Sequence, residues 1–214
     1  MPRTGKINRA IRKSRSLTES GNHGRAAAWN LRAIGMLERA ARFDVLHGLA
    51  DRPALAGLYC ERAGILARLM EWDSACDAAE TAVDLYLDVD PARGAPDLVA
   101  VKVREFRAEH GDAAVVPFEE HIGDAANARG FLALLLARNR GAAAKPAVER
   151  LGSNAVQTFT ELIRVGLAYD REDLRRIRDQ VSQAHRLLTA EAPSQAWRSA
   201  PADILAVYRK AMGK

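Results

Sequence analysis

The stretch AGLYCERAGILARLMEWDSACDAAETAVDLYLDVDP, residues 56–91, decides the fold. Its first half places Tyr59, Ala63 and Leu66 on one face of a predicted helix, because residues three and four apart are neighbours on a helix surface. The segment Met70–Asp73 then supplies a short polar turn. A second helical pattern follows this turn, so the stretch predicts two consecutive helices.

Small residues occupy the inner side of the second helix. Ala75, Ala79 and Ala82 recur at helical spacing, and two antiparallel helices approach closely only where the crossing positions are small. The stretch therefore predicts an α-helical hairpin. Cys60 lies roughly ten residues before the turn and Cys76 only a few after it, so their offset exceeds the distance of roughly 7 Å that a disulfide spans. We expect the two cysteines to be unbridged.

Apolar residues with helical spacing fill the rest of the chain, and residues typical of turns separate the segments. Breaks are predicted at 20–24, 88–96, 141–146 and 192–201. Helices are predicted at 7–19, at 26–37 or on to 43, at 55–70, 74–87 and 98–108, as one or two helices within 118–137, and at 156–168, 174–188 and 201–213. No segment alternates with period two over a useful length, so we predict an all-α fold.

The central hairpin resembles the tetratricopeptide repeat, a helix–turn–helix unit of about 34 residues with an opening aromatic, later alanines and a late proline. The matching positions are Tyr59, Ala63, Leu66, Ala75 and Ala82. The sequence departs from the pattern where Arg62 replaces a leucine, Ala79 replaces an aromatic and Pro91 arrives one turn late. The late position of Pro91 implies a longer second helix than the repeat usually has.

The resemblance covers about half of the chain. A fainter copy lies upstream, at Ala10, Ser14, Leu17, Ala26 and Ala33. A third copy from Asp97 is degenerate, and residues 125–214 contain none. We therefore expect antiparallel hairpins stacked as a short tetratricopeptide-like solenoid, with a C-terminal helical extension or bundle. The expected regions are 1–91 for the hairpins, 92–140 for a degenerate hairpin with a buried apolar helix, and 141–214 for the C-terminal helical region.

Charge is distributed unevenly along the chain. Residues 1–50 carry 10 basic and 3 acidic side chains, residues 51–124 carry 7 and 16, and residues 125–214 carry 15 and 8, which sum to the net charge of +5. A chain with this basic–acidic–basic order can fold back on itself, attract acidic partners at its ends, or self-associate head to tail.

The sequence contains no phosphate-binding loop, no H-E-x-x-H zinc motif and no nucleophile elbow. The acidic residues around Glu120, His121 and Asp124 are expected to form a solvated helix face rather than a metal site. We therefore expect no enzyme activity, no catalytic residues, no cofactor and no metal. The apolar runs are too short to cross a membrane, and the basic N-terminus lacks the features of a signal peptide, so a cytoplasmic protein is expected.

The resemblance implies that the first helix of each hairpin lines a groove that holds a peptide. The residues expected at such positions are Arg12, Arg15, Glu61 and Arg68. Arginines there can hold carboxylates through charge-assisted hydrogen bonds. These residues suggest a protein–protein interaction module, an adaptor or assembly subunit, whose partner is a protein or peptide of acidic character.

A second hypothesis is a nucleic-acid-associated helical protein. Its cations are those of the basic N-terminal arm and of an arginine-rich C-terminal helix, namely Arg9, Arg12, Lys13, Arg15, Arg175, Arg176 and Arg178. Such residues can neutralise phosphates and would give a steep dependence of affinity on salt. The arm has no aromatic residues on which bases could stack, so recognition of single strands by stacking is not expected.

Overall fold

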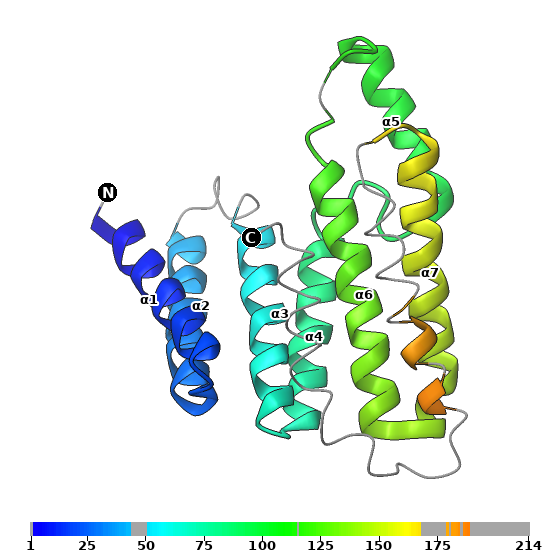
Figure 1. Cartoon of the computed structure of the whole chain (residues 1–214). Coiled ribbons are helices and arrows are strands. Elements are labelled where there is room, and N and C mark those ends of the chain that lie inside the picture. The colour runs from blue at the N-terminus through cyan, green and yellow to red at the C-terminus, as the bar shows by residue number, and fades with distance from the viewer. Residues whose placement is uncertain are drawn as a thin grey trace. The chain divides into compact units, whose positions relative to one another are not determined.

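The computed structural model describes residues 2–43, 51–114, 116–167, 179, 181–184 and 186–188, and this part of the chain contains helices and turns but no strand (Figure 1). The helices are α1 (Pro2–Glu19), α2 (His23–Phe43), α3 (Arg52–Arg68), α4 (Trp72–Leu87), α5 (Pro96–His110), α6 (Glu119–Arg140), the 3₁₀ helix η1 (Gly141–Ala144) and α7 (Lys145–Arg164). The predicted all-α fold is confirmed. The chain divides into two compact units, residues 1–85 and 86–214.

The first hairpin of residues 1–85 is formed by α1 and α2. Gly21 turns the chain with a φ of 75°, which glycine adopts without steric cost, and the N–H of Asn22 donates to the carbonyl of Leu17 at 2.8 Å. The hydroxyl of Ser14 crosses the hairpin to donate to the carbonyl of Ala26 at 3.0 Å. The positions of the fainter repeat are all buried, namely Ala10, Ser14, Leu17, Ala26 and Ala33. This burial confirms the hairpin predicted for this segment.

The second hairpin pairs α3 with α4 (Figure 1). Met70 takes a positive φ of 64° at the turn, and the N–H of Glu71 donates to the carbonyl of Leu66 at 3.0 Å. The small residues predicted at the helix crossing are all buried, namely Ala63, Ala75, Ala79 and Ala82. Cys60 and Cys76 are both buried and are not joined by a disulfide, as expected from their unequal distances to the turn.

Polar contacts as well as apolar packing join α2 to α3. Leu58 of α3 packs into a buried cluster with Ile34 and Leu37 of α2. The fully buried Asn30 donates its amide to the carbonyl of Leu58 at 3.1 Å. At the edge of the same contact, the hydroxyl of Tyr59 donates to Glu38 at 2.9 Å. The two hairpins of residues 1–85 therefore pack on each other in sequential order.

In residues 86–214, α6 is the most buried helix and packs against α7, which also contacts α5. The apolar run 131–137 is buried at every position, as its sequence predicted, and the predicted one or two helices are a single helix, α6, which begins at Glu119. The helix predicted at 156–168 is longer at its start, because α7 begins at Lys145. Pro146 lies in the first turn of α7, where a missing N–H removes no helical hydrogen bond.

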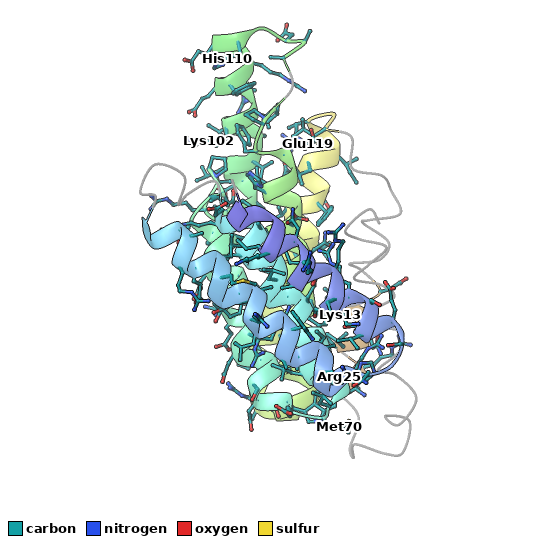
Figure 2. All side chains as sticks on the ribbon, turned by 90° about the vertical axis from the view of Figure 1, so that its left-hand side faces the viewer. Lys13, Arg25, Met70, Lys102, His110 and Glu119 are labelled. Carbon is teal, nitrogen blue, oxygen red and sulfur yellow. The ribbon has the colours of Figure 1, made fainter. Side chains whose placement is uncertain are left out.

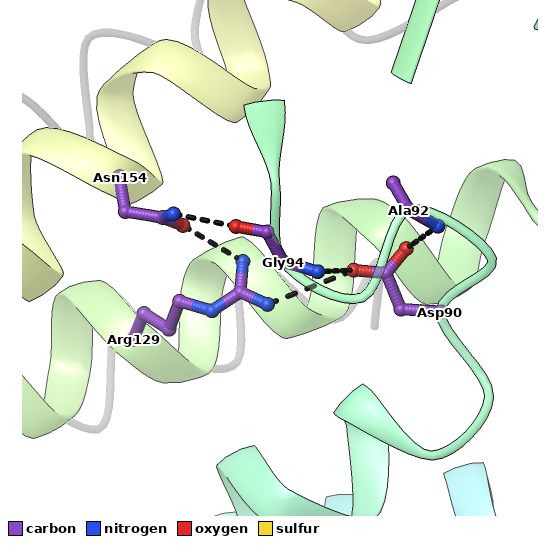
Figure 3. Close-up of polar contacts among 5 residues, drawn as sticks. All are labelled: Asp90, Ala92, Gly94, Arg129 and Asn154. Carbon is purple, nitrogen blue, oxygen red and sulfur yellow. Dashed lines mark hydrogen bonds and ion pairs between the residues drawn. The ribbon is translucent and has the colours of Figure 1, made fainter. Parts of the chain in front are cut away.

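A buried polar network fixes the turn between α4 and α5 (Figure 3). The carboxylate of Asp90 accepts the N–H of Ala92 and the N–H of Gly94, both at 2.8 Å. Arg129 of α6 lies with Nη2 3.6 Å from the same carboxylate and donates Nη1 to the amide oxygen of Asn154 at 3.0 Å. The amide nitrogen of Asn154 then donates to the carbonyl of Gly94 at 2.5 Å. The turn is thereby tied to both α6 and α7.

The chemistry of each group in this network fixes the direction of its hydrogen bonds. Arginine only donates and a carbonyl only accepts, so the amide of Asn154 must direct its oxygen at Arg129 and its nitrogen at Gly94. Burial lowers the pKa of Arg129, while the adjacent Asp90 opposes that shift. The backbone of Gly94 has a φ of 74°, and a Cβ there would collide with the guanidinium of Arg129. The network is therefore a structural device of residues 86–214.

Candidate interaction surface

Two of the predicted groove residues bind each other. Arg15 of α1 places Nη2 2.6 Å and Nε 2.8 Å from the same carboxylate oxygen of Glu61 on α3. The carboxylate side chain is 17% exposed, so this ion pair is partly shielded from solvent and joins α1 to α3. Arg12 is exposed on α1, and Arg68 is half-buried at the end of α3. The structure therefore brings Arg15 and Glu61 together but leaves Arg12 on the surface.

Seven exposed cations lie on the first hairpin, four on α1 and three on α2, and we call this set the basic face. Its members are Lys6, Arg9, Arg12 and Lys13 of α1 together with Arg25, Arg32 and Arg39 of α2. Figure 2 looks onto this hairpin and labels Lys13 and Arg25, one on each helix. The opposite side of α1 carries the buried residues of the hairpin, so the helical period separates cations from core.

The three arginines of α2 were missed by the sequence reasoning above. Arg25, Arg32 and Arg39 follow each other at intervals of seven residues, which places them in one line along the exposed side of the helix. Arg32 also lies over the ring of Trp29, with its guanidinium carbon 5.2 Å from the ring centroid. The seven-residue spacing is the sequence signal that predicts such a line.

The described residues place no carboxylate where it could neutralise the basic face. The only acidic residues of α1 and α2 are Glu19 and Glu38, and Glu38 accepts the hydroxyl of Tyr59. Within the described ranges, no carboxylate lies within ion-pair distance of any of the seven cations. The described residues therefore leave their mutual repulsion unrelieved, and solvent, salt or a bound anion can reduce it.

A second charged surface, which we call the acidic row, lies on α4. It consists of the exposed residues Asp73, Asp77, Glu80 and Asp84, spaced by four, three and four residues along one side of the helix. The helix contains no basic residue, and like charges at this spacing destabilise a helix by about 0.2–0.5 kcal/mol per pair. In the part of the chain that the structure describes, no cation pairs with Asp77, Glu80 or Asp84.

Several sequence-based expectations concern other parts of the chain. Arg175, Arg176 and Arg178 lie outside the described residues. Around His121 and Asp124, and elsewhere among residues with a described position, no group of three or more His, Cys, Asp or Glu side chains is arranged to hold a metal ion. None of the described helices is long and apolar enough to span a bilayer. The charged surfaces of residues 1–85 are therefore the strongest candidate site.

Comparison of the chain with protein-family models, with curated proteins and with solved structures finds no match. The function must accordingly be argued from the surfaces themselves.

Proposed function

We propose that this chain is a non-enzymatic protein-interaction module, a tetratricopeptide-like stack of helical hairpins whose basic face binds an acidic segment of a protein partner. The observation that supports this proposal is the set of seven exposed cations for which the described residues supply no neighbouring carboxylate. An adaptor or assembly subunit would use such a surface to hold its partner.

The basic face is better explained by binding than by folding. Exposed charges contribute little to the free energy of unfolding, and seven like charges on one hairpin repel each other. Carboxylates of a partner would relieve this repulsion and form charge-assisted hydrogen bonds, which arginine can make in bidentate geometry. Complementary charge also raises the rate of association and selects against basic partners.

The ion pair between Arg15 and Glu61 changes which residues this proposal uses. Each of these side chains already has its partner within the hairpin stack, so they support the packing of α1 on α3. Arg12 has no such partner among the described residues and belongs to the basic face together with Arg9 and Lys13. The proposed contact therefore lies on the outer surface of the first hairpin rather than between its first helix and α3.

Nucleic acid is the alternative ligand for the same cations. A strand that binds by base stacking needs exposed aromatic rings. On the first hairpin, Trp29 is half-buried and its ring is covered by Arg32, so the described basic face offers cations for phosphates but no open ring for bases. This arrangement favours an acidic polypeptide, and the experiment below separates the two ligands.

The proposal is tested by measuring the binding of a synthetic polyglutamate peptide and of a random-sequence DNA duplex at a series of salt concentrations. The test variant combines Arg9→Glu with Lys13→Glu, two exposed cations one helical turn apart on α1. The control combines Lys145→Glu with Arg150→Glu, which makes the same charge change on exposed positions of α7. We expect the peptide to bind, and the test variant to weaken binding by roughly tenfold or more while the control leaves it nearly unchanged.

Two results would overturn the proposal. If the duplex binds and the peptide does not, and each lost cation flattens the salt dependence by a similar step, the chain is a nucleic-acid-binding protein. If neither ligand binds at low salt, or if the control variant loses as much affinity as the test variant, the basic face is not a binding surface.

A further inference from the structure

The acidic row has the chemistry that the basic face requires in a partner. Arg25 to Arg39 extend over 14 residues of α2, about 21 Å, and Asp73 to Asp84 extend over 11 residues of α4, about 17 Å. The two lines of charge are therefore comparable in length and opposite in sign. The helix α4 contains no basic residue, and the one carboxylate of α2, Glu38, accepts the hydroxyl of Tyr59.

The two surfaces cannot neutralise each other within one copy of the chain. In residues 1–85, α2 packs on α3 and α3 pairs with α4, so α3 separates the helices that carry the two lines of charge (Figure 1). Both surfaces are exposed, on sides of their helices that point away from the hairpin core. Contact between the basic face and the acidic row therefore needs a second copy of the chain.

We propose that the basic face of one copy docks on the acidic row of a second copy. This inference rests on the proposed function and identifies the partner as the chain itself. The contact joins two different surfaces, and each copy carries both of them. Two copies can satisfy both contacts in a closed dimer, and successive copies can extend the same contact into a larger assembly. Since the attraction is between exposed charges, salt should weaken it.

The test is a charge-swap experiment on the full chain, with molar mass measured by light scattering or sedimentation. The basic-face variant combines Arg25→Glu with Arg32→Glu, and the acidic-row variant combines Asp77→Lys with Asp84→Lys. We expect the unaltered chain to have a mass above the 23.3 kDa of one copy at low salt and to dissociate at high salt. Each variant alone should self-associate at least roughly tenfold more weakly, because two of the charges that attract the opposite surface then repel it.

Mixing the two variants provides the decisive measurement. In the mixture, the reversed charges of one variant can pair with the reversed charges of opposite sign on the other, so association should return as a complex that contains equal amounts of both. A variant that had merely lost its fold would not recover in this way, and circular dichroism checks the helix content of each. The variant with Lys145→Glu and Arg150→Glu should self-associate like the unaltered chain.

The inference fails if the unaltered chain is a monomer at low salt, or if mixing the variants does not restore association. Its failure is distinguishable from failure of the proposed function. A monomeric chain that still binds polyglutamate through Arg9 and Lys13 keeps the interaction-module proposal and excludes only the second copy as the partner.

Discussion

The two units of this chain use charge in opposite ways. In residues 86–214, the side chains of Asp90 and Arg129 are 1% and 4% exposed, and hydrogen bonds to the backbone and to Asn154 surround them. In residues 1–85, the cations of the basic face are exposed, and no described carboxylate lies beside them. A buried charge must be compensated by the fold itself, whereas an exposed charge can be compensated by a partner. The first set is therefore needed for folding and the second is available for binding.

The largest effect is expected where a buried charge loses its partner. Arg129→Ala should lower the free energy of unfolding by about 3–5 kcal/mol, because it leaves the carboxylate of Asp90 buried without a cation and the amide of Asn154 without a donor. The measurement is chemical denaturation followed by circular dichroism. Arg140→Ala, at an exposed position of the same helix, is the matched control and should be nearly neutral. Equal stability of the two variants would show that the network does not hold the turn.

A smaller loss is expected where the hairpin helices approach closely. Ala75→Leu or Ala82→Leu should destabilise the chain by roughly 1–3 kcal/mol, because each adds bulk at a fully buried crossing position. The control is Ala54→Leu on the exposed side of α3. Thermal melting measures the difference between these variants. If all three melt alike, close helix packing at the alanines does not determine the stability of residues 1–85.

These alanines also show how much of the fold could be predicted from sequence. Small residues at helical spacing predicted both hairpins of residues 1–85, because close packing leaves a local and periodic mark. The start of α7 was placed too late, since the glycine and proline of 141–146 are typical of a break. A single turn of 3₁₀ helix and a proline in the first turn of the next helix satisfy the same pattern without a long loop.

The candidate site was less predictable, because its key contacts join residues far apart in the sequence. Arg15 and Glu61 are 46 positions apart, and each one alone looked like a free groove residue. The network of Arg129 with Asn154 and Gly94 is equally invisible to local patterns. The line of Arg25, Arg32 and Arg39 could be predicted, since a seven-residue spacing is local, but the net charge of whole segments does not reveal it.

The comparison between buried and exposed charge also predicts which substitutions should change the free energy of unfolding only slightly. Arg9→Glu and Arg25→Glu should each alter the free energy of unfolding by no more than about 0.5 kcal/mol, because both side chains are exposed and unpaired among the described residues. Arg15→Glu should cost more than either, since it places a second carboxylate beside Glu61. Urea denaturation of the three variants measures this order. Equal losses would contradict the distinction between the basic face and the Arg15–Glu61 pair.

The smallest effect concerns a charge that residues 1–85 acquire only at low pH. Burial, and then the positive charge of Arg68, lowers the pKa of His23 below its ordinary value of 6.5. The folded chain therefore binds fewer protons at this residue than the unfolded chain, and the free energy of unfolding rises with pH across this range. The contribution of His23 to the free energy of unfolding is present above pH 6.5 and is lost as the pH falls through the lowered pKa.

His23→Asn should reduce the loss of stability between neutral and mildly acidic pH, and Arg68→Met should reduce it by a smaller amount, because it removes only the second cause. Denaturation curves at both pH values, compared with the unaltered chain, measure this difference. An identical pH dependence in the unaltered chain and His23→Asn would show that this histidine gains its proton as easily as an exposed one, and that residues 1–85 tolerate new charge even at a partly buried helix start.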